Sequence, residues 1–445
     1  MDNTIVKGGI IIMIISSSII SNAQVKLSGD IRSRAEYRHG YKSLADLSQD
    51  PAFFISQRTR LTFSYDSEKY KVGIALQDIR TWGNQTQLNI SDNLLSIHEA
   101  WAEILFKNDL SLKLGRQELV YDDQRILGNV DWAMQGRSHD VALFKYAGKK
   151  IKVHLGGAFN QDKEQLDNNI YTVPKNYKTL QFLWMNNKLS DKLSASLLVL
   201  NNGLQVSSTD TSGNVKYDTR FSQTLGTRLV HKGEIWSINS SLYLQTGKDG
   251  AGKRLSAYNI AADISYKITG KLSAIVGLEY LSGQNQTDTT RAYTNINHSF
   301  TPFYGTNHKF NGLMDYFYVG SGHGQVGLQD AFVKIKYKNS KKQWLGADLH
   351  IFSSGATVLD NKAFTDNAEI KEMDKYLGFE IDLTGGFKIA KEVDLKMGYS
   401  HMLGSETLAI LKGVTKTDGN GRTDQISNWA WVMVVIKPTL IDNSP

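Results

Sequence analysis

The stretch ISQRTRLTFSYDSEKYKVGIALQ (residues 55–77) decides the fold class. In its first half, Leu61 and Phe63 alternate with polar residues that include Arg58 and Arg60. Successive side chains of a β-strand point to opposite faces, so such a strand separates an apolar face from a charged one. The second half repeats the alternation after a short polar connection. The stretch therefore predicts two antiparallel strands that share one apolar and one ionic face.

The same alternation recurs along nearly the whole chain after residue 24. It predicts about 18 strands of roughly 9–13 residues, a length that crosses a bilayer at a tilt. The predicted strands are 25–37, 55–66, 70–77, 95–107, 109–117, 137–146, 149–160, 177–187, 191–202, 219–231, 233–246, 255–267, 270–282, 327–338, 341–353, 375–388, 391–402 and 427–437. Residues 310–320 are aromatic but have no hairpin partner, so they are assigned to a loop.

The connections between these strands alternate in length. Short polar junctions begin at Asp66, Lys107, Ala147, Lys188, His231, Thr269, Lys338 and Ala390. The junctions between them are long, the longest being 283–326. Outer-membrane barrels have short periplasmic turns and long extracellular loops. The pattern therefore favours an all-β fold, a transmembrane antiparallel β-barrel of about 18 strands.

The number of strands decides which face points to lipid. A soluble barrel buries its apolar face inside, whereas a membrane barrel turns it outward, and alternation alone permits both. Closing about 18 strands leaves an interior too wide for side chains to fill. Aromatic residues near strand ends are then expected in the interfacial girdles, although each could equally be a core aromatic. They are Tyr65, Tyr70, Phe106, Tyr146, Trp236, Tyr266, Tyr280, Tyr337, Trp344, Trp429 and Trp431.

Residues 1–23 are predicted to be a signal peptide. Lys7 precedes an apolar segment at 10–20, and Ser21 and Ala23 are small residues at the −3 and −1 positions. The apolar segment is short for a membrane span. We assign residues 24–445 to a single barrel domain located in the outer membrane.

Composition narrows the partners. The chain has no cysteine, so no disulfide supports an exported fold. Its net charge of +7 favours an anionic solute or lipopolysaccharide over nucleic acid for an exported protein. The ten histidines show no ligand spacing, so the sequence predicts no metal site and no cofactor.

A charged stretch, GRQELVYDDQRILGNVDWAMQGRS (residues 115–138), follows the fifth predicted strand. A long outer loop above a wide tube can fold inward. Ion pairs such as Arg116 with Glu118, or Arg125 with Asp122 or Asp123, would fix it there and leave other guanidinium groups facing the channel.

This stretch, with QRTRLTFSY (57–65), ALQDIRTWG (75–83) and HEAWAEI (98–104), resembles the alginate-export family of bacterial outer-membrane barrels. The resemblance covers about the first third of the chain. It implies an 18-stranded monomeric barrel with an arginine-rich pore for an anionic uronic-acid polymer. The matching basic positions are Arg58, Arg60, Arg80, Arg116, Arg125 and Arg137, with Asp78, Glu99, Glu103 and Glu118 as acidic partners. One departure is that the chain continues past Trp431, where such barrels often close with a terminal aromatic.

The arginines have two interpretations. A ring of guanidinium groups would concentrate a polyanion, and several weak contacts suit conduction. Alternatively, arginines and carboxylates inside a barrel only pair across strands. Arg32 and Arg34, beside Asp30 and Glu36, are included among the pore-lining candidates and are also the best candidates for such a ladder.

Catalysis is not expected. Glu99 and Glu103 are four residues apart on a strand, which places them roughly 13 Å apart on one face, beyond the separation of a glycosidase pair. We therefore expect passive passage of an anionic solute, such as an acidic oligo- or polysaccharide. Two alternatives stay open: a general non-selective porin, and a secreted β-rich polysaccharide-binding protein or lyase. A periplasmic partner that docks on the short turns also stays open.

Overall fold

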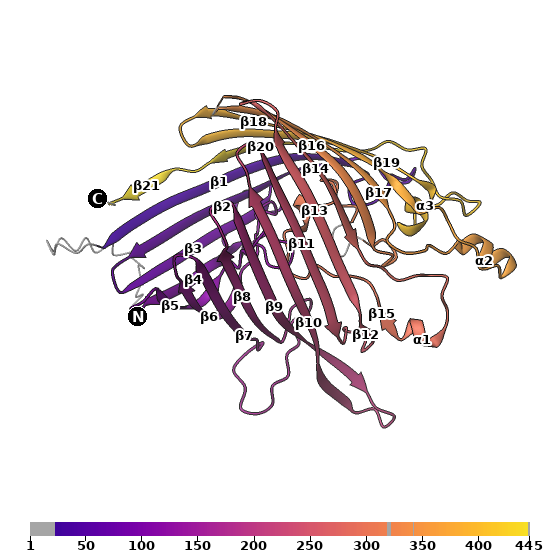
Figure 1. The fold of residues 1–445 in the computed structure, drawn as a ribbon, viewed down its shortest axis with the longest axis horizontal. Helices are drawn as coiled ribbons and strands as arrows, with labels where there is room; N and C mark the ends of the chain where they lie inside the picture. Colours follow the sequence, from indigo (N-terminus) through magenta and orange to yellow (C-terminus); the bar gives the residue numbers. More distant parts are fainter. Residues whose placement is uncertain (1–22, 318–321, 341, 444–445) are drawn as a thin grey trace, which may run out of the picture.

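The computed structural model describes residues 23–317, 322–340 and 342–443. Residues 1–22, which hold nearly all of the predicted signal peptide, lie outside this description. Within it the strands form one closed antiparallel barrel (Figure 1). The main sheet has 19 strands, but β21 (Thr439–Asp442) continues β20, so the wall is 18-stranded.

The 18 predicted strands each overlap one strand of the wall, which confirms the fold class. The wall strands are β1 (Gln24–His39), β2 (Ala52–Asp66), β3 (Tyr70–Thr81), β4 (Leu95–Leu105), β5 (Leu110–Gln117), β6 (His139–Ala147), β7 (Ile151–Phe159), β8 (Thr179–Lys188), β9 (Leu193–Thr209), β10 (Val215–Lys232), β11 (Trp236–Gly247), β13 (Ala257–Lys267), β14 (Leu272–Leu281), β16 (Leu328–Ser340), β17 (Gln343–Ser353), β18 (Tyr376–Ala390), β19 (Val393–Gly404) and β20 (Ser427–Ile436). Two short strands, β12 (Arg254–Leu255) and β15 (Ile296–Asn297), pair with each other in the loops.

The barrel closes between its first and last strands. β1 pairs with β20 and, beyond Pro438, with β21. Proline has no N–H and interrupts the ladder, but its carbonyl still accepts a hydrogen bond from Gly29 N at 2.9 Å. The residues that follow Trp431 therefore complete the closing strand.

The apolar face of the wall points outward and the ionic face points into the lumen. On β2, Leu61 is 41% exposed on the outside, whereas Arg58 is 0% exposed on the inside. Leu278 on β14 and Ile351 on β17 are likewise exposed on the outer surface. This is the arrangement that a lipid-facing barrel requires.

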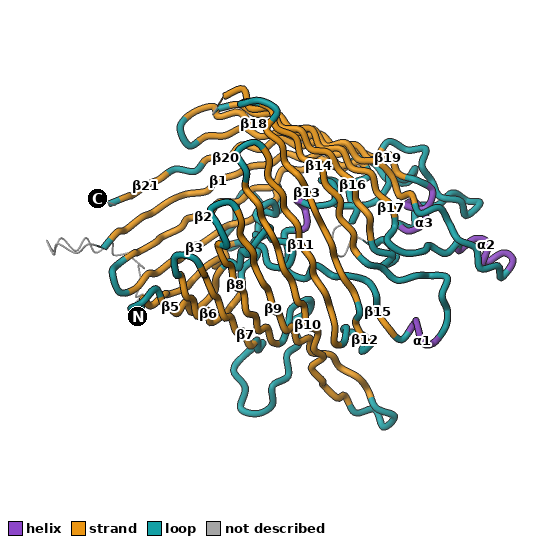
Figure 2. Tube along the Cα trace, viewed as in Figure 1, coloured by secondary structure: helices purple, strands orange, loops and turns teal. Residues whose placement is uncertain are grey.

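The two ends of the barrel differ as the sequence predicts. The eight connections at one end are 67–69, 106–109, 148–150, 189–192, 233–235, 268–271, 341–342 and 391–392. The connections at the other end are longer, and β9 and β10 extend past their neighbours there (Figures 1 and 2). In outer-membrane barrels the short-turn end faces the periplasm.

Exposed aromatic side chains lie near the periplasmic turns, as expected of a girdle: Tyr70, Phe106, Tyr146, Trp236, Tyr266 and Tyr337. Trp429 and Trp431 were expected in a girdle as well, and this expectation is wrong. Both rings are buried on the inner face of β20, where they pack against Trp132 at 5.6 and 4.9 Å between ring centroids. They alternate with Val432 and Val434, which face outward.

The helices are short and lie in the outer loops: α1 (Arg291–Thr294), η1 (Asn307–Lys309), α2 (Asn361–Asn367) and α3 (Glu406–Leu411). None of the helices in the described part of the chain is long and apolar enough to cross a membrane. The described part of the segment 310–320, up to residue 317, is a loop, as predicted.

Candidate functional site

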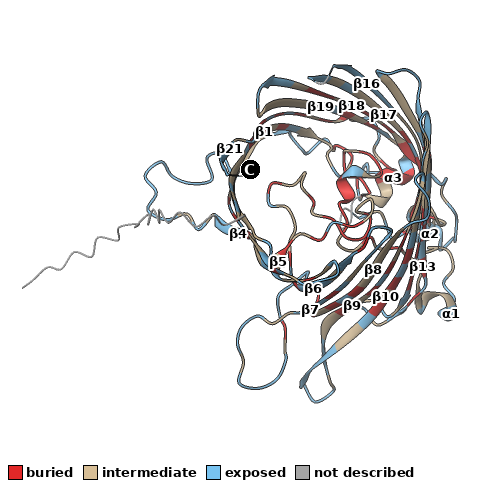
Figure 3. Ribbon diagram, turned by 60° about the vertical axis from the view of Figure 1, so that its left-hand side comes forward, coloured by how far each residue is buried: buried red, intermediate tan, exposed pale blue. Residues whose placement is uncertain are grey.

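Two outer loops turn into the lumen and pack against each other (Figure 3). The first inward loop, residues 118–138, connects β5 to β6, and the second inward loop, residues 299–317, belongs to the connection between β14 and β16. Gly128 N donates to Tyr304 O at 2.9 Å, and Tyr304 N donates to Ile126 O at 3.1 Å. The inward fold predicted for the first loop is confirmed.

The two inward loops enclose a small hydrophobic core. Leu119 and Leu127 of the first loop, and Met314 and Tyr316 of the second, are at most 1% exposed. Burying such side chains contributes roughly 1.5–3 kcal/mol each. The loops therefore form a packed layer inside the barrel, and this layer narrows the lumen.

One side of this constriction is a cationic wall, formed by the inward-facing Arg32, Arg34, Arg58 and Arg60 of β1 and β2. Three of these side chains donate to main-chain carbonyl oxygens of the first inward loop. Arg32, Arg34 and Arg58 reach the carbonyls of residues 131, 132 and 134 at 2.9, 2.8 and 3.3 Å. Guanidinium groups have five donors and no acceptor, so carbonyl oxygens are suitable partners for them.

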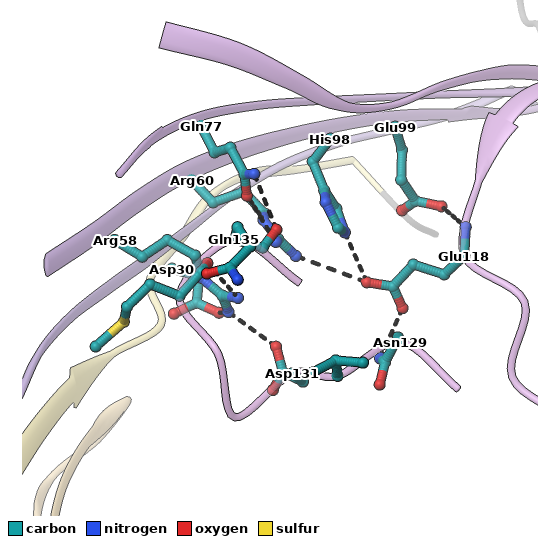
Figure 4. Close-up of polar contacts among 12 residues, drawn as sticks. Asp30, Arg58, Arg60, Gln77, His98, Glu99, Glu118, Asn129, Asp131 and Gln135 are labelled. Atoms are coloured by element: carbon teal, nitrogen blue, oxygen red, sulfur yellow. Dashed lines mark hydrogen bonds and ion pairs between the residues drawn. The ribbon is translucent and has the colours of Figure 1, made fainter. Parts of the chain in front are cut away.

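Two carboxylates balance the cationic wall (Figure 4). Arg58 Nη2 lies 2.6 Å from Asp30 and 3.0 Å from Asp131, and Arg32 Nη2 lies 2.7 Å from Asp30. Asp131 belongs to the first inward loop, so these ion pairs tie the loop to the wall. Burial works against the charged form of Asp131, but Arg32 and Arg58 hold its pKa below the usual range.

Glu118, at the start of the first inward loop, is a second junction between loop and wall (Figure 4). Its carboxylate is 2.8 Å from His98 Nε2, accepts from Asn129 Nδ2 at 2.7 Å, and lies 3.8 Å from Arg60. Its backbone N–H donates to Glu99 at 3.1 Å. Burial opposes ionisation of Glu118, but the hydrogen bonds from His98 and Asn129 lower its pKa.

A cavity of about 560 Å³ lies between β1–β3 and the two inward loops. Arg34, Glu36, Arg38 and Trp132 are among its lining residues. Arg38 donates to Glu36 through Nε and Nη2, at 3.0 and 2.8 Å, and its guanidinium lies 4.2 Å from the ring centroid of Tyr41. The cavity thus combines cationic and aromatic groups, but most of its charge is already paired.

A second part of the barrel, three to six strands from β1, carries an anionic wall: Glu279 on β14, Asp330 on β16, and Glu380 and Asp382 on β18, all buried. Glu380 Oε1 accepts from the N–H of residue 314 at 2.8 Å, and Asp382 accepts from the N–H of residue 313 at 3.3 Å. The anionic wall therefore binds the second inward loop by its backbone N–H groups.

Side chains of both loops complete the anionic wall. Asn311 Nδ2 donates to Glu279 at 2.8 Å and to Asp330 at 3.1 Å. Arg125 forms an ion pair with Glu279 and lies over the ring of Phe310 at 3.7 Å. The partner of Arg125 was expected among Asp122 and its neighbours, but local carboxylates cannot compete with a buried one on the wall.

The other candidates near the loops also have partners. Arg137 Nη1 donates to the carbonyl oxygen of Gly305 at 3.0 Å, which joins the two inward loops. Glu103, on the inner face of β4, is 2.6 Å from Lys145 and accepts from Ser111 at 2.6 Å. Both residues therefore have a clear structural role.

The guanidinium groups of Arg80 and Arg116 do not point into the lumen, in contrast to the expectation, although residue 80 borders the 560 Å³ cavity. Arg116 alternates with the outward Leu114 and pairs at 3.0 Å with Asp140, which faces it across β5 and β6. Arg80 and its partner Asp78, at 2.5 Å, continue the outward face of β3. Both arginines lie on the outer surface near the extracellular rim, because strand alternation fixes the face that a side chain occupies.

Sequence reasoning missed a set of inward-facing lysines in the periplasmic half of the wall. They are Lys113, Lys152, Lys232, Lys336 and Lys396, and among the described residues none of them forms an ion pair. Lys113 Nζ lies 3.6 Å from the ring centroid of Trp101, and Lys336 Nζ lies 4.4 Å from that of Trp344. The phase of the alternation places each lysine on the polar face, so the signal was present in the sequence.

Histidine–carboxylate contacts in the lumen are isolated pairs. His308 Nδ1 is 2.8 Å from Asp315, and His350 Nδ1 is 2.9 Å from Asp330. Across the described ranges, no group of three histidine and carboxylate side chains could hold a metal ion. The pairs fix the second inward loop and the anionic wall.

An 18-stranded barrel with an apolar exterior, short periplasmic turns and loops folded into its lumen defines an outer-membrane channel of the porin type. The solved structure of the outer membrane protein OpdK from Pseudomonas aeruginosa agrees with this class. It matches with a TM-score of 0.59 at 11% sequence identity, over 93% of this chain and 98% of OpdK.

Two further structures have the same architecture. OpdL from Pseudomonas aeruginosa matches with a TM-score of 0.59 at 12% identity, over 94% of this chain and 99% of OpdL. OccAB4 from Acinetobacter baumannii matches with a TM-score of 0.60 at 10% identity, over 94% and 98%. At such identities the likeness shows the fold alone.

The chain belongs to the alginate-export family. The family's sequence model, described as alginate export, matches residues 23–418. The resemblance noted in the first third of the chain thus extends over most of it. A search of curated protein sequences found no match.

Proposed function

We propose that this channel passes anionic solutes, and that the lysine-lined periplasmic half of its lumen selects them. The observation that carries this proposal is the set of inward-facing lysines without an ion pair. The arginines of the constriction form hydrogen bonds and ion pairs with the inward loops. These lysines form no ion pair with a described residue, so their charge can attract a solute. Lysine is a hydrated point charge on a flexible stem, so it attracts anions without holding them rigidly.

The basic character is strongest at the periplasmic mouth. A cavity of about 310 Å³ there is lined by Lys149, Lys150, Lys152, Lys188, Lys192 and Lys232. Asp191 is its one lining carboxylate and is 2.9 Å from Lys188. A mouth with charges of one sign raises the local concentration of the opposite ion, and several weak contacts let the ion leave again.

An acidic oligo- or polysaccharide is the solute class we favour. The family is described as alginate export, and a row of carboxylates along a polymer would meet the lysines in succession. A solved structure of OpdK contains vanillate, a carboxylate, in a barrel of the same fold. No catalytic step is part of this proposal.

The test is the reversal potential of the purified protein in a planar bilayer under a KCl gradient. We expect preference for chloride, and block by uronate oligomers added from the periplasmic side. A triple variant of lysines from this set, Lys152→Gln with Lys232→Gln and Lys336→Gln, should lower the anion preference several-fold. The matched control replaces three exposed lysines of the outer loops by glutamine: Lys163, Lys371 and Lys416.

Equal passage of potassium and chloride through the unaltered protein would reject the proposal and leave a general porin. An unchanged reversal potential in the triple variant would reject the role of the lysines. Equal shifts in reversal potential in the triple variant and its control would show that the net charge of the protein sets the ion preference, and not the lysines of the periplasmic half.

A further inference from the structure

A third cavity, of about 660 Å³, lies at the extracellular end of the barrel, away from the lysines of the periplasmic mouth. Its walls are the extension of β9 and β10, residues 171–176 of the β7–β8 loop, and the start of the second inward loop. Cavities of roughly 300–1,000 Å³ are typical of small-molecule sites. This one is therefore large enough for two or three sugar rings.

The lining of this outer cavity is aromatic and uncharged in character. Its four aromatic side chains are Tyr171, Tyr217, Phe303 and Tyr304. Only Lys175 and Asp249 carry charge. The carboxylate of Asp249 already accepts from Asn297 Nδ2 and from the N–H of Lys253, both at 2.9 Å.

Two amide side chains of the lining have an NH₂ group without a hydrogen-bond acceptor among the described residues. Asn202 is 0% exposed; its Oδ1 accepts from Tyr304 at 2.5 Å, and its Nδ2 has no partner within the described chain. Gln205 Oε1 accepts from the N–H of Tyr171 at 3.1 Å, and its Nε2 is likewise buried without a partner in that part of the chain. A buried donor without an acceptor is costly, so each such group in a native structure needs an explanation.

The backbone at the floor of the cavity is strained. Phe303 has a φ of 31°, a left-handed value that a bulky residue rarely adopts. Strain of this kind persists only where the surroundings impose it, and it is frequent at ligand sites. Here it fixes the Phe303 ring next to Tyr304, with the ring centroids 5.9 Å apart.

We propose that the outer cavity binds a neutral oligosaccharide. A pyranose ring has an apolar C–H face that packs on an aromatic ring, and a rim of hydroxyls that accept and donate hydrogen bonds. The aromatic rings offer the first contact, and the two amide donors offer the second. Asn202 and Gln205 are three residues apart on β9 and lie on its opposite faces, so the sugar would contact them at the edge of β9 that extends beyond β8. This inference goes beyond the anion channel and does not depend on it.

The chemistry of the lining argues against two other ligand classes, an anionic polymer and a purely apolar ligand. An anionic polymer would meet one exposed lysine here, against six lysines at the periplasmic mouth. A purely apolar ligand would leave the two amide donors without acceptors. A neutral sugar needs no cationic partner, and its hydroxyl groups supply acceptors for both amide donors.

The test is calorimetric titration of the detergent-solubilised full chain with neutral trisaccharides built from glucose, mannose or galactose, and with a uronate trisaccharide. We expect at least one neutral trisaccharide to bind. Tyr217→Ala should weaken that binding about tenfold, because an aromatic contact is lost. Tyr217 is exposed, so this variant should fold. Phe364→Ala, an exposed aromatic of α2 outside the cavity, is the matched control and should bind as the unaltered protein does.

Gln205→Leu provides an independent check, since it removes the amide and keeps a side chain of similar size. It should also weaken binding. The inference is overturned if no neutral trisaccharide binds, if the uronate trisaccharide binds more tightly, or if Tyr217→Ala binds as tightly as the Phe364→Ala control. The lysine triple variant should leave sugar binding unchanged, and Tyr217→Ala should leave the reversal potential unchanged, so either proposal can fail alone.

Discussion

The cationic wall and the anionic wall bind the two inward loops through different backbone groups, the carbonyl oxygen on one wall and the N–H on the other. Arginines of β1 and β2 donate to carbonyl oxygens of the first inward loop. Carboxylates of β18 accept from N–H groups of the second inward loop. A loop inside a barrel loses water from its backbone, and the wall charges replace that water.

The walls differ in how their own charge is compensated. Arg32 and Arg58 form ion pairs with Asp30 and Asp131. Glu380 forms no ion pair with any described residue, and its Oε2 is buried without a hydrogen bond from that part of the chain. The cationic wall therefore depends on paired charge, whereas this part of the anionic wall depends on its hydrogen bonds to the loop.

Arg58→Met is the variant from which we expect the largest loss of stability. It removes one of the two arginines that Asp30 and Asp131 share and leaves them only Arg32, and breaking a buried ion pair costs about 3–5 kcal/mol. We expect a lower free energy of unfolding in lipid vesicles, measured by urea titration of tryptophan fluorescence. We also expect larger single-channel currents, because the first inward loop loses its anchor. Unchanged stability and unchanged currents together would show that this wall does not hold the loop.

Glu380 permits a sharper comparison on the anionic wall. Glu380→Gln keeps the size of the side chain and an oxygen that accepts from the N–H of Met314, so we expect little loss of stability. Glu380→Leu removes the acceptor and should cost about 1–3 kcal/mol, because a buried N–H is left unsatisfied. Urea titration of both variants separates the hydrogen bond from the rest of the carboxyl group. Equal losses in the two variants would mean that the hydrogen bond to Met314 does not account for the stabilisation.

The wall itself could be predicted from the sequence because its signal is local. Side chains alternate along each strand whatever the rest of the chain does, so strand positions and the inward face of Arg58 followed from residues 55–66. The same rule would have placed Arg80 and Arg116 outside. They were assigned to the pore by family resemblance, which identifies matching residues but carries no information on strand phase.

The partners of the wall could not be predicted, because they depend on distant contacts. Asp131 is 73 residues from Arg58, and Asn311 is 186 residues from Arg125. The acidic residues of β14, β16 and β18 lie on the polar faces of their strands, and the successive pairing of β14, β16, β17 and β18 brings them to one side. The alternation rule also places the inward-facing lysines on the polar faces of their strands. The sequence analysis considered only arginines as groups that attract an anion.

Lys412, at the end of α3, extends the comparison, because it is a cation that binds a carbonyl of the second inward loop. Its Nζ donates to Tyr316 O, and burial, with a smaller effect of Lys42, lowers its pKa to about 7. In the unfolded chain this lysine titrates near pH 10.5. Between about pH 7 and 10.5 the unfolded chain therefore holds one more proton, so stability should rise with pH by up to about 1.4 kcal/mol per unit.

Urea titrations at pH 7.5 and 8.5 test this window. Lys412→Met should remove the rise in the free energy of unfolding between these two pH values. Lys416→Met, which changes an exposed lysine of the same loop, should keep it. The same pH dependence in the Lys412→Met variant would assign the effect to another group.

Arg116→Gln is expected to have the smallest effect, and it tests the placement of this arginine directly. Its ion pair with Asp140 is solvent-exposed, and exposed pairs contribute about 0–1 kcal/mol. Because the side chain lies outside the barrel, ion selectivity in a planar bilayer should stay the same. A shift in reversal potential as large as that of the lysine triple variant would put Arg116 in the conduction path, and would mean that the extracellular part of β5 turns its other face to the lumen.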